Sequence, residues 1–569
     1  MKEGESNLLY YGDNLDILRR YVKDETVDLV YLDPPFNSNT NYNVLFAEKD
    51  GSKAASQIQA FSDTWTWNQE SESTFAEIVM AGGKVSDCLQ AFRNFLGECD
   101  MLAYLVMMAP RLAELRRVMR STASIYLHCD PTASHYLKML MDAVFGPINF
   151  RNEIIWKRTT SKSLMTRRLP SNHDVILNYQ ASPDACWNAD AMFSAYDLAN
   201  LDEKTTGKYC QRDKDGRLYQ LDNLSNPNPD RPNLTYEFLG VTKVWRWTKE
   251  RMQKAYEDGL VIQPSPGAIP RFKRYLDEQK GKPLDDVWTD IPPLNSQAAE
   301  RLGYPTQKPV ALLERIIRAS CPEGGLVLDP FCGCGTTIAA AQALGHPWIG
   351  IDITHLAITL IKQRMKDSFG IEQGVRATPT GKVRETVAEY GAVTKRPFHV
   401  VGEPTSEPDA EALAASDPYQ FQWWALGLVG ARPVEQKKGA DKGIDGRIIF
   451  QGDKPGTFES VILSVKAGKT GSTHVRDLKG VLEREKAAIG VLISMQEPPG
   501  PMKTEAVTAG FYESALWGKK YPKLQLFTVA ELLAGKKIEM PPIRQVGATF
   551  KKAPKAGAEK KAEQQELQV

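Results

Sequence analysis

The stretch Leu29-Val30-Tyr31-Leu32-Asp33-Pro34-Pro35-Phe36 decides the fold of this chain. The apolar run over residues 27–32 is typical of a central parallel strand. The prolines end that strand, because neither donates a backbone hydrogen bond and each fixes its own φ. Asp33 and Phe36 are therefore expected at the carboxyl end of a strand, where open α/β sheets place their ligands.

These residue types suit one task in particular. Asp33 and the Pro34 carbonyl offer acceptors for the two N–H bonds of an exocyclic amino group, and Phe36 offers a ring to stack on a planar base. The plain alternative is an ordinary turn between a strand and a loop.

A second apolar strand runs into a glycine-rich turn at Leu328-Asp329-Pro330-Phe331-Cys332-Gly333-Cys334-Gly335-Thr336. The glycines permit positive φ and close approach of a ligand to the backbone. The helix expected over residues 338–344 offers free N–H groups to a carboxylate. A further strand over residues 348–351 ends at Asp352, which is placed to accept hydrogen bonds from ribose hydroxyls.

The two stretches together resemble the amino-methyltransferases of DNA, which move a methyl group from S-adenosylmethionine to N6 of adenine or N4 of cytosine. The catalytic motif precedes the cofactor loop, as in the β group of that family, which includes the modification subunits of type III restriction systems. The resemblance covers about residues 7–365. It implies a Rossmann-like α/β methyltransferase in which Asp33, Pro34, Pro35 and Phe36 form the catalytic motif.

The resemblance also implies a set of cofactor-binding residues. Asp13 would belong to the adenine subsite, although it also reads as a helix N-cap. Thr306 and Lys308 would lie near the methionine carboxylate, although Pro309 also reads as a plain helix entry. The full set comprises Asp13, Thr306, Lys308, Asp329, Phe331, Gly333, Gly335, Thr336 and Asp352.

A basic segment with interleaved hydroxyl groups follows the strand expected over residues 152–156. Its side chains suit phosphate contacts, and a solvated loop is the alternative. The expected DNA-binding residues are Lys157, Arg158, Lys162, Arg167 and Arg168. His128, at the end of another predicted strand, reads more readily as a structural residue than as part of the pocket.

Composition and charge limit the possible location, metal sites and partners of the protein. The formal net charge of +1 means that any nucleic-acid surface is a local patch. No apolar run approaches a membrane span, and the first residues hold no signal core, so we expect a cytoplasmic protein. The eight scattered cysteines predict free thiols and no zinc site. Double-stranded DNA is the expected partner, and the resemblance leaves a homodimer and a separate restriction subunit open.

A new globular unit begins near residue 409. Its order of elements resembles the Mrr-type branch of the PD-(D/E)xK restriction-endonuclease fold, a second and smaller α/β domain. By that resemblance Asp445 would bind Mg²⁺ and Lys466 would stabilise the phosphate. Ser464 stands where the fold usually has an acidic residue or Gln, which weakens any metal site, and Glu435 is a candidate substitute.

The predicted organisation has six parts. They are a catalytic part at 1–156, a target-recognition region at 157–295, a cofactor part at 296–366, a linker at 367–408, the endonuclease-like domain at 409–548 and a disordered tail at 549–569.

The predicted product is N6-methyladenine, because adenine enzymes of this family usually begin their motif with Asp and cytosine-N4 enzymes with Ser. Four alternatives stay open. They are an N4-cytosine enzyme, a methylase of RNA or protein, a DNA-binding regulator without catalysis, and a nuclease that uses the methylase half as a sensor.

Overall fold

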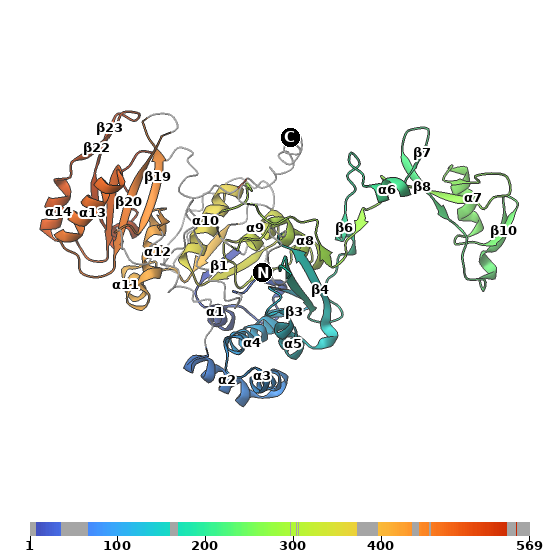
Figure 1. Ribbon diagram of the computed structural model, residues 1–569, viewed down its shortest axis with the longest axis horizontal. Coiled ribbons are helices and arrows are strands. Elements are labelled where there is room, and N and C mark those ends of the chain that lie inside the picture. Colours follow the sequence, from blue (N-terminus) through green and yellow to red (C-terminus); the bar gives the residue numbers. More distant parts are fainter. Residues whose placement is uncertain are drawn as a thin grey trace, which may run out of the picture. The chain divides into compact units, whose positions relative to one another are not determined.

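The computed structural model describes residues 7–35, 67–159, 169–295, 298–302, 304, 306–372, 397–434, 443–453, 457–542 and 554. Within them the chain forms two compact units, one over 189–285 and one made of the remainder. Figure 1 labels the elements of both units.

The larger unit is built on a nine-stranded sheet of order β14-β4-β5-β3-β2-β15-β16-β1-β17. The strands are β1 (Asn7–Tyr11), β2 (Val27–Leu32), β3 (Met119–Cys129), β4 (Phe150–Lys157), β5 (His173–Gln180), β14 (Val287–Trp288), β15 (Val327–Asp329), β16 (Trp348–Asp352) and β17 (Phe398–Val401). The helices are α1 (Asn14–Tyr21), α2 (Gln69–Ala81), α3 (Gly83–Leu96), α4 (Asp100–Val118), α5 (Ser134–Phe145), α8 (Val310–Ser320), α9 (Thr336–Ala343) and α10 (His355–Phe369).

Strand β2 is buried along its whole length, as its apolar sequence predicts. Successive side chains of a strand point to opposite faces. Val30 and Leu32 therefore join the core beneath α1 to α5, whereas Leu29 and Tyr31 join the core beneath α8 to α10. The result is a sheet with helices on both faces, a Rossmann-like three-layer arrangement (Figure 1).

Parallel pairing places several carboxyl ends at one edge. Strands β1, β16, β15, β2 and β3 are parallel neighbours in that order. Strand β5 runs antiparallel to both of its neighbours, β3 and β4. The residues that follow β1, β2, β15 and β16 therefore gather at one edge of the sheet.

One strand of the sheet comes from the predicted linker. We expect some strand content in that linker, and residues 398–401 form β17, which pairs in parallel with β1. The sequence Phe398-His399-Val400-Val401 is apolar enough for a strand, but it is too short to stand out among the turn residues around it.

The smaller unit, 189–285, lies inside the predicted target-recognition region. Its core contains Leu224, Phe238, Trp245, Met252 and Val261. Its elements are β6 (Phe193–Ser194), α6 (Glu203–Lys208), β7 (Gln211–Arg212), β8 (Leu218–Asn223), β9 (Thr235–Phe238), β10 (Val241–Val244), α7 (Lys249–Glu257), β11 (Val261–Ile262), β12 (Arg271–Tyr275) and β13 (Lys282–Pro283).

The C-terminal domain is organised on a five-stranded sheet of order β18-β19-β20-β21-β24, with β20, β21 and β24 parallel. Separate apolar clusters cover its two faces. Its elements are α11 (Glu407–Ser416), α12 (Pro418–Leu428), β18 (Arg432–Pro433), β19 (Gly446–Gln451), β20 (Phe458–Lys466), α13 (Ser472–Glu485), β21 (Ile489–Ser494), α14 (Gly500–Val507), β22 (Phe511–Ser514), β23 (Lys519–Pro522), β24 (Leu524–Thr528) and α15 (Val529–Leu533). Among the helices of the described ranges, none combines the length and apolar character that a membrane crossing requires.

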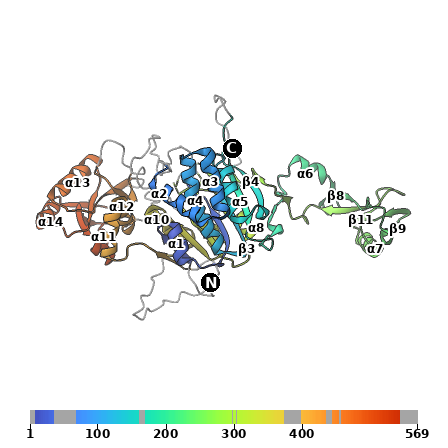
Figure 2. The ribbon, with the colours of Figure 1, turned by 90° about the horizontal axis from the view of Figure 1, so that it is seen from below.

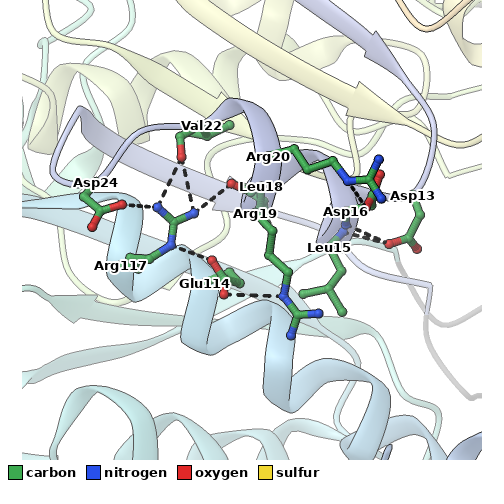
Figure 3. Close-up of polar contacts among 10 residues, drawn as sticks. All are labelled: Asp13, Leu15, Asp16, Leu18, Arg19, Arg20, Val22, Asp24, Glu114 and Arg117. Carbon is green, nitrogen blue, oxygen red and sulfur yellow. Dashed lines mark hydrogen bonds and ion pairs between the residues drawn. The ribbon is translucent and has the colours of Figure 1, made fainter.

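Arg117 closes the carboxyl end of α1. Its guanidinium donates to the carbonyl oxygens of Leu18 (2.7 Å) and Val22 (3.2 Å), and it pairs with Glu114 and Asp24 (Figure 3). The last carbonyls of a helix lack partners within the helix, so a cation there is favourable. These contacts join the end of α1 to α4, the helix that carries Arg117.

We predict that Arg117→Met lowers the free energy of unfolding by about 1–3 kcal/mol, because it leaves the carbonyls of Leu18 and Val22 without their side-chain donor. The matched control is Arg20→Met, which removes an exposed i,i+4 pair with Asp16 and should change stability by at most about 0.5 kcal/mol. Urea unfolding measures both. Equal effects would show that the position of Arg117 is unimportant.

Candidate active site

Four carboxylates gather where the parallel strands end. Asp33 follows β2, Asp329 ends β15, Asp352 ends β16 and Asp13 follows β1. The register of β1 against β16 pairs Tyr11 with Asp352, and the Gly12 N–H donates to the Asp352 carbonyl at 3.0 Å. The topology thus brings together two motifs that lie far apart in the sequence.

Asp33 is engaged by a cation. Lys308 Nζ lies 2.6 Å from Asp33 Oδ2, and both side chains are largely buried. The family resemblance predicts Lys308 near a methionine carboxylate, and the structure places its ammonium group beside the predicted catalytic carboxylate. One oxygen of Asp33 is held by the ammonium group, while a carboxylate offers about four acceptor positions in all. Asp33 therefore keeps acceptor capacity for a further donor.

The glycine loop, residues 331–335, is held to the end of β16. The Gly333 N–H donates to Asp352 Oδ2 at 2.9 Å, and the Phe331 N–H donates to Asp329 Oδ1 at 3.0 Å. Gly333 and Gly335 both have positive φ. A Cβ on Gly333 would lie 3.2 Å from the Tyr304 ring, so a side chain would fill this space. The loop needs glycine for both its backbone angles and its close contacts.

Burial makes two of these acids difficult to ionise. Burial raises the pKa of Asp329 to about 7. Hydrogen bonds from Thr337 and from the Phe331 backbone lower the pKa, but their effect is smaller than that of burial. Burial also raises the pKa of Asp352 to about 6, although the backbone and side chain of Thr354 and the Gly333 N–H stabilise its charge. This edge of the sheet therefore favours hydroxyl donors and positive charge.

Asp13 is committed to local structure. Its Oδ1 accepts hydrogen bonds from the Leu15 N–H (2.9 Å) and the Asp16 N–H (3.2 Å), so it caps α1. Its Oδ2 lies 2.6 Å from Arg111 Nη2. The N-cap interpretation holds, and Asp13 still lies at the same sheet edge as Asp352.

The expected DNA contacts divide into two groups. Arg158 Nη1 lies 3.1 Å from Asp174 Oδ1, and Lys157 is exposed at the end of β4. Lys162, Arg167 and Arg168 lie outside the described residues, as does Phe36. Thr336 directly follows the glycine loop and begins α9. Thr306 lies two residues after Tyr304, whose ring is next to Gly333.

A buried chain of polar groups supports strand β2, which precedes Asp33. Tyr31 Oη lies 2.9 Å from His128 Nδ1, and His128 Nε2 lies 3.0 Å from Asp174 Oδ2. His128 is fully buried, away from solvent. Arg158, through Asp174, joins the same chain and so contacts the scaffold of the active site.

Sequence reasoning missed one residue that holds the glycine loop. Arg364, on α10, donates to the Cys334 carbonyl at 3.2 Å and is almost fully buried. The segment Ile361-Lys362-Gln363-Arg364 reads as an ordinary polar turn of helix, so nothing in the sequence marks it.

The predicted nuclease residues of the C-terminal domain lie close together but are few. Asp445 is buried, and its Oδ2 accepts hydrogen bonds from the Val465 N–H (2.6 Å) and Ser464 Oγ (3.2 Å). Lys466 Nζ is 4.0 Å from the same oxygen. Glu435 lies outside the described residues, and the described ranges contain no cluster of three His, Cys, Asp or Glu able to hold a metal.

Comparison with known proteins identifies the methylase part. Residues 27–363 match the family model described as DNA methylase, of the N6/N4 type. The chain belongs to the DNA methylase family. A second model, NACHT-associated inactive Restriction Endonuclease 1, matches residues 420–534. That match supports a restriction-endonuclease-like domain, while the Mrr-type affiliation stays a prediction.

Two curated relatives are similar over the methylase part. The Mod subunit of the type III enzyme StyLTI from Salmonella typhimurium is 26% identical over 357 residues, which are 60% of this chain and 50% of that protein. The type II methyltransferase M.EcaI from Enterobacter cloacae is 26% identical over 364 residues, 63% of this chain and 69% of that protein. The chain thus spans only half the length of the first relative.

Among solved structures, TTHA0409 from Thermus thermophilus, complexed with S-adenosyl-L-methionine, is 15% identical. It aligns with 63% of this chain and 93% of its own, at a TM-score of 0.30. The fold assignment stands on the sheet topology described above.

We predict that Asp329→Asn stabilises the ligand-free protein in a pH-dependent way. The pKa of Asp329 rises from 3.8 to about 7 on folding, so its ionisation opposes folding increasingly between about pH 4 and pH 7, and fully above that. The variant should gain stability over wild type across this interval, with a ceiling of roughly 4 kcal/mol. Urea unfolding at about pH 5 and about pH 8 measures the difference.

The control for this measurement is Asp184→Asn, which alters an exposed loop carboxylate and should give no such gain. A gain for Asp329→Asn that is independent of pH would contradict the burial argument.

Proposed function

We propose that this protein is a site-specific DNA methyltransferase that transfers a methyl group from S-adenosylmethionine to N6 of adenine. The observation that carries the proposal is the meeting of Asp33 with the glycine loop and Asp352 at one sheet edge, in a chain of the DNA methylase family. S-adenosylmethionine supplies an electrophilic methyl group on a positively charged sulfur.

The residues at this edge suit that cofactor. Asp329, which is buried, and Asp352, which is partly buried, provide acceptors for ribose hydroxyls and a negative environment for a sulfonium. The tight glycine loop admits a ligand where any side chain would intrude. The amino end of α9, directly after Gly335, offers N–H groups to a carboxylate.

Asp33 and the Pro34 carbonyl would hold the amino group of the target. Accepting its two N–H bonds draws the nitrogen toward tetrahedral geometry and frees its lone pair for in-line attack. Lys308 orients the Asp33 carboxylate through the 2.6 Å contact. The base must leave the duplex stack to reach this site. Catalysis rests on orientation and electrostatics, without a covalent intermediate on the protein.

Double-stranded DNA is the proposed substrate, and the unit at 189–285 is the proposed reader of the target site. Its surface carries exposed basic residues next to half-buried aromatic ones, as where the Arg251 guanidinium lies 4.3 Å from the centre of the Trp247 ring. A separate restriction subunit is the proposed protein partner, because relatives such as the StyLTI and EcoP15I proteins are named Mod subunits. The homodimer and the cytoplasmic location stay predictions.

We also propose that the C-terminal domain keeps the endonuclease fold without an effective metal centre. The Asp445 carboxylate accepts a hydrogen bond from the backbone N–H of Val465 in β20. Ser464 occupies the position where a second carboxylate is expected. A single carboxylate is a poor Mg²⁺ site. The matching family model, described as inactive, supports the same proposal.

The adenine proposal predicts a specific product. Plasmid DNA incubated with the protein and S-adenosylmethionine should contain N6-methyladenine after digestion and mass spectrometry. Asp33→Ala should reduce turnover by roughly 10²-fold or more, while isothermal titration still shows cofactor binding. Detection of N4-methylcytosine instead would overturn the choice of base, and the absence of both products would overturn the transferase.

The C-terminal proposal predicts weak or no cleavage of methylated and unmethylated plasmids over a Mg²⁺ series. Ser464→Glu should improve cleavage, because two carboxylates bind a divalent cation better than one. Lys466→Ala should leave methylation unchanged and end any cleavage. Efficient cutting by wild type that persists in Lys466→Ala would show that the assignment of these residues is wrong.

A further inference from the structure

Helix α12, the helix of the C-terminal domain that follows α11, has two buried faces. Phe421, Trp424, Ala425 and Leu426 pack in the core of the C-terminal domain. Gln420, Trp423 and Gly427 recur at helical spacing on another side. Figures 1 and 2 both place α12 beside α10 of the methylase sheet, and residues on this second side contact α10 or its neighbours.

Gln420 completes the start of α10. The His355 N–H belongs to the first turn of α10, where backbone donors have no partner within the helix. Gln420 Oε1 accepts this hydrogen bond at 3.1 Å, and both residues are buried. Asp352 lies three residues before His355, so the contact is made next to the proposed ribose acceptor.

Trp423 reaches the glycine loop itself. It forms one apolar cluster with Cys334 of that loop and with Leu356 and Leu360 of α10, and Tyr304 packs against the same cluster. Cys334 stands between the two glycines with positive φ. A side chain of the C-terminal domain therefore supports the outer surface of the loop that the methylase part uses for its cofactor.

Helix α10 connects these contacts to the loop. Arg364 donates to the Cys334 carbonyl, and a Cβ on Gly335 would lie 2.7 Å from Ile361 Cγ1. The approach of α12 to α10 is equally close, since a Cβ on Gly427 would lie 2.9 Å from Thr359 Oγ1. A small shift of α12 would therefore displace α10, and with it the loop.

From these contacts we propose that Gln420 and Trp423 of the C-terminal domain are positioning residues of the cofactor site. Docking of this domain on α10 and binding of the cofactor at the glycine loop then stabilise each other. The proposal rests on the proposed use of S-adenosylmethionine by the glycine loop. It gives the endonuclease-like domain a role that requires no cleavage. Coupling of this kind is reciprocal, because the free energy that links two binding events acts equally on both.

The first test uses Gly427→Ala in the full-length chain. Alanine favours a helix more than glycine, so α12 itself should stay folded. The added methyl group should instead push α12 away from Thr359. We expect the dissociation constant for S-adenosylmethionine, measured by isothermal titration, to rise by about tenfold. Thr359→Ala in the same chain removes the obstructing side chain and should restore wild-type affinity.

The second test uses Trp423→Ala, which should also raise the dissociation constant for S-adenosylmethionine by about tenfold. Its matched control is Leu428→Ala, on the same helix, where the side chain is exposed and belongs to neither face. Thr359→Ala alone is the second control. Unchanged affinity in both Gly427→Ala and Trp423→Ala, beside a wild type that binds, would overturn the proposal.

Hydrogen exchange of the ligand-free protein separates this proposal from the cofactor assignment. Amides of residues 331–337 should exchange faster in Gly427→Ala than in wild type, and Thr359→Ala should reverse the change. If wild type gives no heat with S-adenosylmethionine, the cofactor assignment fails, while altered exchange still shows that α12 supports the loop. If exchange in the loop is the same in all variants, the positioning role is refuted.

Discussion

The parallel pairing of β1, β16, β15 and β2 is the constraint on which the rest of the molecule depends. It directs four strand ends, each followed by or ending in aspartate, to one edge of a single sheet. An antiparallel neighbour would turn its carboxyl end to the opposite edge of the sheet. The helices on both faces bury Asp329 and partly bury Asp33 and Asp352, while Asp13 is exposed, so four acids are concentrated at this edge.

Such a concentration of charge must be offset, and the protein does so in different ways at different positions. The ammonium group of Lys308 neutralises Asp33, and Arg111 neutralises Asp13. Asp352 and Asp329 are stabilised by backbone and hydroxyl donors, and burial still raises the pKa of both. The negative charge that is not compensated destabilises the ligand-free protein. A cationic ligand would stabilise the protein by binding there.

The sequence predicts elements far better than it predicts their partners. The apolar run 27–32 and the capped segment after Asp13 match β2 and α1, because their signals are local. The role of Lys308 could not be found in this way, since its partner lies 275 residues away. Strand content was expected near β17, but its pairing with β1 could not be found, because the two strands lie far apart in the sequence. Arg364 looks like any other surface arginine until α10 is placed against the loop.

Strand β17 also bears on how this molecule is divided into fragments. It covers one side of β1, so the methylase sheet is completed by residues that follow the last methylase helix by almost thirty positions. A fragment that stops after α10 would expose the backbone N–H and C=O groups of Leu8 to Tyr10. Exposed strand edges pair readily with other chains. The isolated methylase part would therefore aggregate during expression, even though every residue assigned to its chemistry would be present.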